Sequence, residues 1–247
     1  MSAIDFSDAD KHDRLLRDPF NVELNAAVDL AVLTAQREAR GYLGASGAGS
    51  ECARKIQFDW MCSSPLSAQQ SLIFGRGHAA EATMRAQLQR AGYEFASPEA
   101  LEFDLFEYFS GHCDGIIIAG PRLPGIYFQF PAIWECKCLG QKGWRAIVRD
   151  GLTKANPTYA TQIALYQLHL KKTNPALYTV INANTCEVAH FPVPFDAERA
   201  ERATQRIKRV IEAIKAGELL PRAYRDPSDR RCVRYCAHGD RCWRLPP

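Results

Sequence analysis

Two carboxylates and a lysine lie in strongly apolar sequence, where charged side chains are costly to bury. Asp114 is followed by "GIII", and Glu135 and Lys137 stand in "IWECKCL". Because an unpaired buried charge costs several kcal/mol, we expect a metal ion, a partner charge or a substrate to compensate it. Carboxylates bind Mg²⁺ or Mn²⁺, a bound cation acidifies water, and a nearby lysine orients that water. The three residues therefore indicate divalent-metal hydrolysis, with a purely structural ion-pair network as the alternative.

Side-chain alternation separates these charges from the neighbouring cysteines. Glu135 and Lys137 share one face of an expected strand, and the cysteines beside them share the other face. The same alternation turns the cysteine before Asp114 away from that carboxylate. The cysteines expected to be small buried side chains, and not ligands, are Cys113, Cys136 and Cys138.

A second reactive group lies in the basic stretch "DRRCVRYCAHGDRCW" near the end of the chain. Its cysteines, Cys232, Cys236 and Cys242, are separated by three and then five residues, unlike the two-residue spacing common in structural zinc sites. Thiolates suit an iron-sulfur cluster, which usually requires four cysteines. Cys52, in "SECARKIQFDW", is the candidate for the fourth ligand, and Cys62 competes with it.

Sequence periodicity indicates which elements position these groups. Apolar spacing predicts helices over residues 21–43, 50–61, 64–92, 156–172 and 196–219. Aromatic and β-branched residues punctuated by glycine and proline predict strands within residues 101–120, 125–140 and 176–193. This order predicts an α/β fold whose sheet carries the carboxylates.

Composition limits the class of protein. The 247 residues, 47% of them hydrophobic, suffice for one substantial core. The net charge of +3 is mild, but arginines outnumber aspartates between Arg222 and Arg244, which suits contact with phosphates. No apolar run resembles a secretory signal or approaches the ~20 residues of a membrane span, so we expect a cytoplasmic protein without membrane contact. In a reducing compartment, nine cysteines favour buried thiols and a metal site over disulfides.

The stretches "GHCDGIII" and "WECKC" resemble the signature of the PD-(D/E)XK nucleases. The resemblance implies a restriction-endonuclease-like core, in which helices flank a mixed central sheet. It also implies that Asp114 and Glu135 bind Mg²⁺ or Mn²⁺, that the backbone carbonyl of Cys136 is a further ligand, and that Lys137 is the catalytic lysine.

Two further stretches resemble motifs of the RecB-family nucleases in the same chain order. "FGRGHAAEATMR" places His78, Glu81 and Arg85 along one helical stripe and resembles the family's glycine and histidine helix. This implies that His78 joins the metal site, with Glu81 as a second candidate. "YATQIALYQLHL" resembles the family's motif of Gln, three residues and Tyr, which implies that Gln162 and Tyr166 support the site and contact DNA.

One early and three late cysteines around these motifs closely resemble the iron-sulfur RecB-family exonucleases, including the AddB nuclease domain and the CRISPR-associated four-cysteine exonuclease. The resemblance implies that a structural 4Fe-4S cluster joins the N- and C-terminal segments, with zinc in the same thiolates as the alternative. Its ligands would be Cys52, Cys232, Cys236 and Cys242, because "ECARK" matches the family pattern better than Cys62 does. Residues 1–50 would be a helical extension, and residues 51–247 the nuclease domain.

These motifs imply a metal-dependent DNA exonuclease acting on single strands or DNA ends in recombination, repair, phage DNA processing or CRISPR adaptation, where it would meet protein partners. The residues expected to contact DNA are Arg54, Arg76, Lys142, Trp144 and Arg145. Two alternatives stay open at this point. One is a catalytically silent iron-sulfur protein that binds nucleic acid, and the other is an endonuclease or RNase on the same core. Cutting polarity, strand preference and oligomeric state are not predicted.

Overall fold

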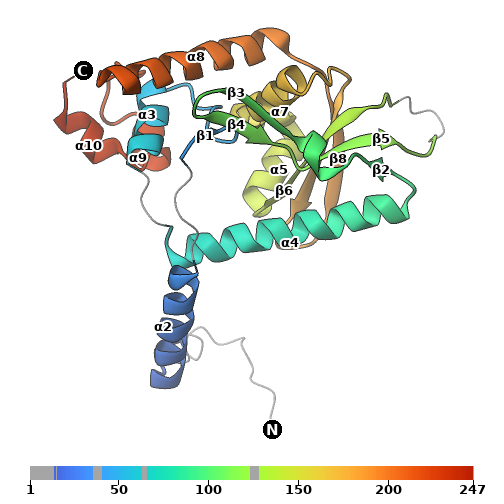
Figure 1. The fold of residues 1–247 in the computed structure, drawn as a ribbon. Coiled ribbons are helices and arrows are strands. Elements are labelled where there is room, and N and C mark those ends of the chain that lie inside the picture. Colours follow the sequence, from blue (N-terminus) through green and yellow to red (C-terminus); the bar gives the residue numbers. More distant parts are fainter. Residues whose placement is uncertain (1–13, 15, 36–40, 63–65, 123–127, 247) are drawn as a thin grey trace. The chain divides into compact units, whose positions relative to one another are not determined.

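The structure is a computed structural model that describes residues 14, 16–35, 41–62, 66–122 and 128–246. The chain divides into two compact units, coloured along the sequence in Figure 1. The smaller unit comprises residues 1–39 and 64–78, and the larger unit comprises residues 40–63 and 79–247. The domain boundary expected at residue 50 stays a prediction.

The smaller unit contains helix α2 (Pro19–Thr34), which is mostly apolar and buries none of its residues. The carboxylate of Asp18 caps the helix by accepting a hydrogen bond from the backbone N–H of Phe20 at 3.0 Å. The helix predicted over residues 21–43 thus ends earlier, at Thr34, and part of the remainder lies outside the described residues.

Helix α4 (Ala68–Arg90) passes from the smaller unit into the larger one. In the smaller unit its apolar side chains Leu72, Ile73 and Phe74 are exposed, whereas Leu88 in the larger unit is buried. The two halves of one helix therefore contribute differently to the core, which explains why the units divide within it.

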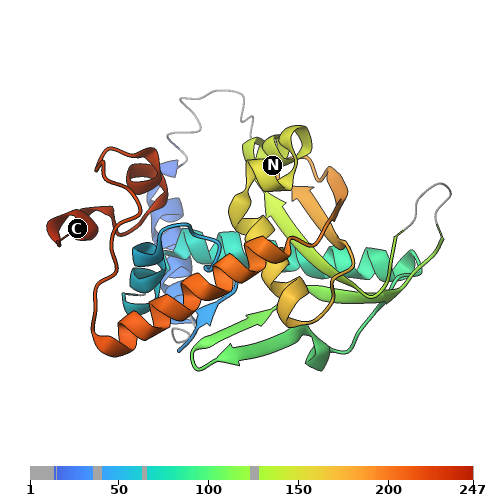
Figure 2. The ribbon, with the colours of Figure 1, turned by 90° about the horizontal axis from the view of Figure 1, so that it is seen from above.

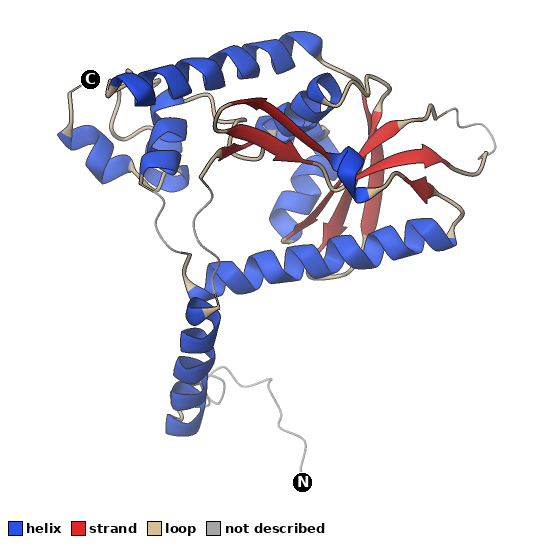
Figure 3. Ribbon diagram, in the orientation of Figure 1, coloured by secondary structure: helices blue, strands red, loops and turns tan. Residues whose placement is uncertain are grey.

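A five-stranded mixed sheet is the centre of the larger unit (Figure 3). Its strand order is β2 (Glu94–Phe95), β5 (Gly115–Ala119), β6 (Ala132–Leu139), β7 (Ala176–Asn182), β8 (Val188–Val193). Strand β6 pairs antiparallel with β5 and parallel with β7. The parallel pair is connected through helices, as a parallel crossover requires.

A second sheet has three strands in the order β1 (Leu43–Gly44), β4 (Phe109–His112), β3 (Glu102–Phe106). The 3-10 helix η1 (Pro98–Leu101) leads into β3. Gly111 in β4 has to lack a side chain, because a Cβ atom there would lie 2.5 Å from the ring of Phe103. Close packing of aromatic rings thus fixes this small sheet onto the core.

The remaining helices of the larger unit are α3 (Ala53–Met61), α5 (Gln141–Asp150), α6 (Leu152–Ala155), α7 (Pro157–His169), α8 (Ala197–Ala216), α9 (Arg230–Tyr235) and α10 (Gly239–Arg244). Helix α8 contacts α7 and α3, and Figure 2 shows it spanning the distance between them. It buries residues at the spacing of one helical face: Ala200, Ala203, Ile207 and Val210.

Alternate residues of the central sheet face two apolar clusters. Ile116 and Ile133 pack in the cluster that includes residues of α7 and α8. Trp134 and Cys136 pack in the opposite cluster with Leu88 of α4. The predicted α/β fold, a mixed sheet flanked by helices, is confirmed. None of the described helices combines the length and the apolarity needed to cross a membrane.

Candidate functional site

Asp114 and Glu135 are brought together by the pairing of β5 with β6. Gly115 pairs with Trp134 in the antiparallel register, so the residue before Gly115 lies across from Glu135. The Asp114 carboxylate accepts a hydrogen bond from the backbone N–H of Cys136 at 2.8 Å. This bond holds Asp114 against the middle of β6, beside the second carboxylate.

Lys137 lies between these two acids. Its Nζ donates to Glu135 Oε1 and, at 3.3 Å, to the backbone carbonyl of Cys136. The same Nζ is 3.8 Å from Asp114 Oδ2 and 5.6 Å from the ring centre of Tyr159. The side chains predicted to share one face of the strand therefore contact one another in the structure.

Glu135 is a fully buried carboxylate with an unsatisfied oxygen. Its Oε2 has no hydrogen-bond partner among the described residues. Burial and the neighbouring Asp114 carboxylate raise the pKa of Glu135 to about 8, although Lys137 opposes the shift. Burial lowers the pKa of Lys137, but the Glu135 and Asp114 carboxylates outweigh this and raise it, so the lysine stays protonated. Two adjacent hard oxygen donors, one of them unpaired, fit a divalent cation.

Arg85 supports the backbone at Asp114. From the part of α4 in the larger unit, it donates a hydrogen bond to the carbonyl oxygen of Asp114. Its guanidinium lies 4.8 Å from the ring centre of Phe95 and 5.7 Å from that of Trp134. The sequence placed Arg85 on the stripe with Glu81, but gave no indication of this contact.

Gln162 and Tyr166 lie on α7 and are both buried, as their position in the core requires. Gln162 Nε2 donates to the hydroxyl oxygen of Tyr166 at 2.9 Å, and Gln162 Oε1 has no partner among the described residues. Burial, together with the Glu135 carboxylate, raises the pKa of Tyr166. The burial of this pair leaves little surface for direct contact with DNA.

The two candidate ligands on α4 have different positions. Glu81 lies in the larger unit, and its charge contributes to raising the pKa of Glu135. His78 is exposed and belongs to the smaller unit, so its role at the metal site stays a prediction. Within the described part of the chain, no three His, Cys, Asp or Glu side chains are grouped so that they could hold one metal ion.

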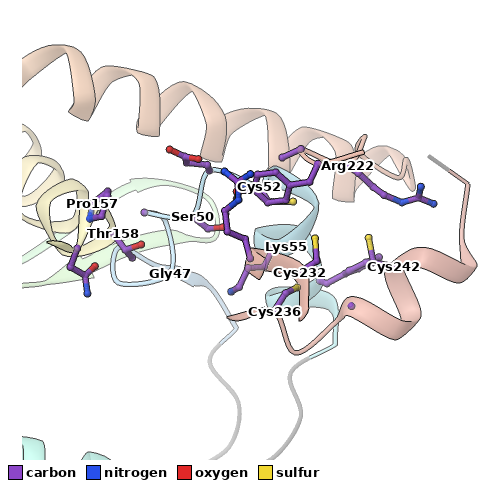
Figure 4. A pocket seen from close by; sticks show the side chains of 18 of the residues that line it. Gly47, Ser50, Cys52, Lys55, Pro157, Thr158, Arg222, Cys232, Cys236 and Cys242 are labelled. Carbon is purple, nitrogen blue, oxygen red and sulfur yellow. The ribbon is translucent and has the colours of Figure 1, made fainter. Parts of the chain in front are cut away.

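The four predicted cysteine ligands line one cavity of about 570 Å³. Figure 4 shows the side chains of Cys52, Cys232, Cys236 and Cys242 around the same space, which the start of α3 and the C-terminal helices α9 and α10 enclose. Cationic side chains also line it: Lys55, Arg222 and Arg231. Burial raises the pKa of Cys232 and Cys236.

Cys62 does not line this cavity. Its Sγ instead accepts a hydrogen bond from Arg241 Nη1 at 2.7 Å. The other contacts between α3 and the C-terminal segment include Asp59 with His238, at 2.8 Å. Of the two cysteines that competed for the fourth position, Cys52 is the one that lies beside the other three.

The residues expected to contact DNA differ in exposure. Lys142 and Arg145 are exposed on α5, and Arg76 is exposed in the smaller unit. Trp144 is half-buried and packs against the core. Arg54 is only 1% exposed, so it has no surface with which to contact DNA and is not retained as a DNA ligand. Arg149, on the same helix as Lys142, is also exposed, but it was not among the residues expected to contact DNA.

Neither a family model nor a curated protein matches the sequence. Among solved structures, the alkaline exonuclease LHK-Exo from Laribacter hongkongensis is similar with a TM-score of 0.50 at 13% identity, over 78% of this chain and 93% of that one. SSO0001 has a TM-score of 0.49 at 14% identity, over 92% of this chain and 100% of its own. LHK-Exo in complex with dAMP has a TM-score of 0.49 at 13% identity. At such identity, the first comparison shows a shared fold alone.

Proposed function

We propose that this protein is a metal-dependent DNA exonuclease that hydrolyses phosphodiester bonds at DNA ends or in single strands. The observation that carries the proposal is that Lys137 contacts both Glu135, on the same strand β6, and Asp114, which directly precedes the adjacent strand β5. The fold shared with an alkaline exonuclease supports it. The alternative, a purely structural ion-pair network, does not account for the unpaired Glu135 Oε2.

The residues that would hold Mg²⁺ or Mn²⁺ are Asp114, Glu135 and the backbone carbonyl of Cys136. When bound, the cation would acidify a water molecule and stabilise the charge that develops on the phosphate. Glu135 would release its proton to bind, because a carboxylate binds a hard cation in its ionised form.

Lys137 would act as a cation and hydrogen-bond donor. Its raised pKa keeps it protonated, which favours orienting the attacking water over deprotonating it. Its contacts with Glu135 and the Cys136 carbonyl fix the position of Nζ, so little reorganisation is needed when charge develops. Gln162 and Tyr166, both buried, would support the Glu135 side chain from the core.

The exposed cations on α5 provide a surface for the DNA backbone. Lys142, Arg145 and Arg149 recur at the spacing of one helical face. Since α5 begins directly after β6, these cations follow the strand that carries Glu135 and Lys137. Phosphate contacts of this kind position a nucleic acid without reading its sequence.

We further propose that the four cavity cysteines bind a 4Fe-4S cluster with a structural role. The chemistry of the donor set fits, because four thiols from opposite ends of the chain surround one space that cations also line. A cluster held there would tie α3 to the C-terminal segment. Zinc bound by the same thiols is the alternative, which the structure favours less because no three of these thiols, all within the described residues, are grouped so that they could hold one ion. Iron and sulfide analysis distinguishes the two.

Degradation of end-labelled DNA tests the nuclease. Wild type and Lys137→Ala would be incubated with linear duplex, single-stranded and covalently closed circular DNA, with Mg²⁺ or EDTA. Lys208→Ala, which removes an exposed lysine of α8, is the matched control. We expect Mg²⁺-dependent release of nucleotides from linear DNA by the wild type and the control only. Salt-sensitive binding without degradation would refute the enzyme, and cleavage of the circle would make it an endonuclease.

A further inference from the structure

Arg54, near the start of α3, is a buried cation that pairs with no carboxylate among the described residues. It is 1% exposed. Its Nε donates to the carbonyl of Leu220, and its Nη1 donates to the carbonyl of Pro246 at 2.7 Å. Nη2 has no hydrogen-bond partner, and none of the ion pairs within the described residues includes Arg54.

Such a residue is costly unless an anion balances its charge. A buried cation loses its hydration, and neutral carbonyl oxygens compensate only part of the loss. A buried lysine can release its proton, but arginine cannot do so in a protein. The charge of Arg54 therefore has to be balanced from nearby.

A predicted cluster ligand, which can become an anion, lies beside Arg54. Arg54 Nη1 lies 3.9 Å from Cys242 Sγ, a distance suited to an N–H to sulfur hydrogen bond. Cys242 lines the cavity together with Cys52, Cys232 and Cys236. Bound to iron, each of these groups is a thiolate, and four thiolates outweigh the positive charge of the iron-sulfur core.

We propose that Arg54 is the internal charge partner of the cysteine-bound cluster. It donates to the Cys242 sulfur and offsets the negative charge of the thiolates, while its other donors hold Leu220 and Pro246, which precede and follow the tail cysteines. The proposal rests on the proposed cluster. A guanidinium suits this position because its planar, rigid set of donors reaches three acceptors at once.

Three other cations line the cavity and are less suited to this role. Arg222 donates to the carbonyl of Leu245 and lies 4.4 Å from the ring centre of Trp243. Arg231 is exposed and pairs with Asp229 at 2.7 Å.

Lys55 follows Arg54 directly and lines the cavity, but it is partly exposed and pairs with Asp59 at 2.6 Å. Lys55 is therefore the matched control, since its loss removes the same charge from the adjacent position.

Reductive titration of the cluster in anaerobically purified full-length protein tests the proposal. Removing a nearby positive charge disfavours the reduced, more negative cluster. We expect Arg54→Gln and Arg54→Met to lower the equilibrium constant for reduction about tenfold, which is about 59 mV for one electron. We expect Lys55→Met to change this equilibrium constant less than twofold. Arg54→Lys retains the charge and is also expected to change the constant less than twofold.

Neutral variants with a wild-type potential would overturn the role of Arg54, even if their thermal stability is lower, because loss of the carbonyl contacts alone explains lower stability. If neither neutral variant folds, Arg54→Lys decides, since loss of its cluster despite the retained charge contradicts the proposal. A wild-type protein without iron and sulfide overturns the cluster itself. The two failures are therefore distinguishable.

Discussion

Replacing Glu135 with glutamine should stabilise the metal-free protein, and the gain should grow with pH. The folded protein holds a proton on Glu135 up to about pH 8, whereas the unfolded chain releases it near the ordinary pKa of 4.5. Between these values the folded state binds more protons than the unfolded state, so the free energy of unfolding of the wild type falls as pH rises. Glutamine is neutral and nearly isosteric, and therefore escapes this loss.

The magnitude follows from the raised pKa. One proton bound only by the folded state changes the free energy of unfolding by about 1.4 kcal/mol per pH unit. From pH 5 to pH 8 the difference between Glu135→Gln and the wild type should therefore grow by about 4 kcal/mol, as an order of magnitude, because the side chain is fully buried and little screened by solvent.

Denaturant unfolding of both proteins in EDTA, repeated across this pH range, measures the difference. Addition of Mn²⁺ at pH 8 should stabilise the wild type and leave Glu135→Gln nearly unchanged. A stability difference that does not vary with pH, or a variant less stable than the wild type at pH 8, would refute the reasoning about this carboxylate.

Three further predictions concern the supporting residues. Arg85→Met should lower the rate of DNA degradation about tenfold by releasing the Asp114 backbone, while circular dichroism shows an unchanged fold; a wild-type rate contradicts this role. Cys232→Ser should lose iron, as measured by metal analysis, whereas Cys62→Ser, outside the cavity, should retain it; equal iron in both variants counts against the ligand set. Lys142→Ala and Arg145→Ala should each reduce the salt dependence of DNA binding by about one phosphate contact, measured by fluorescence anisotropy over a salt series; unchanged slopes would remove α5 from the DNA surface.

The positions of the charged residues were predictable because charge in a buried strand is rare. The alternation along β6 placed Glu135 with Lys137, and the structure has them in contact. Burial of Cys113 and Cys136 was predicted by the same alternation and is confirmed, whereas Cys138, predicted to be buried with them, is only half-buried. The geometry of Glu135 and Lys137 relative to Asp114 depends on the antiparallel register of β5 and β6, which a single sequence does not determine.

Helix α5 was not predicted. Gly140 and Gly151 flank it and Gly143 lies within it, and glycine is a poor helix former. Its apolar face is nevertheless held by the core through Ile147. Tertiary packing therefore outweighs the low helix propensity of this segment, and the resulting helix has a basic outer face.

Arg54 was expected at the surface because basic residues usually lie there. A signal to the contrary was present, since Arg54 shares one helical stripe with Gln57 and Phe58, and all three are buried. What covers that stripe is the segment after α8, far away in the sequence, whose carbonyls at Leu220 and Pro246 accept from Arg54. The sequence pattern of α3 alone does not predict such a long-range contact.

The central claim is that Asp114 and Glu135 together bind a divalent cation. Calorimetric titration of Mn²⁺ at pH 7, in buffers of different ionisation enthalpy, tests it most directly because it counts the protons released on binding. We predict that the wild type binds Mn²⁺ with release of close to one proton, which Glu135 holds beforehand, and that Asp114→Asn and Glu135→Gln bind far more weakly. Binding of equal strength by these variants, or no binding by the wild type, would contradict the account.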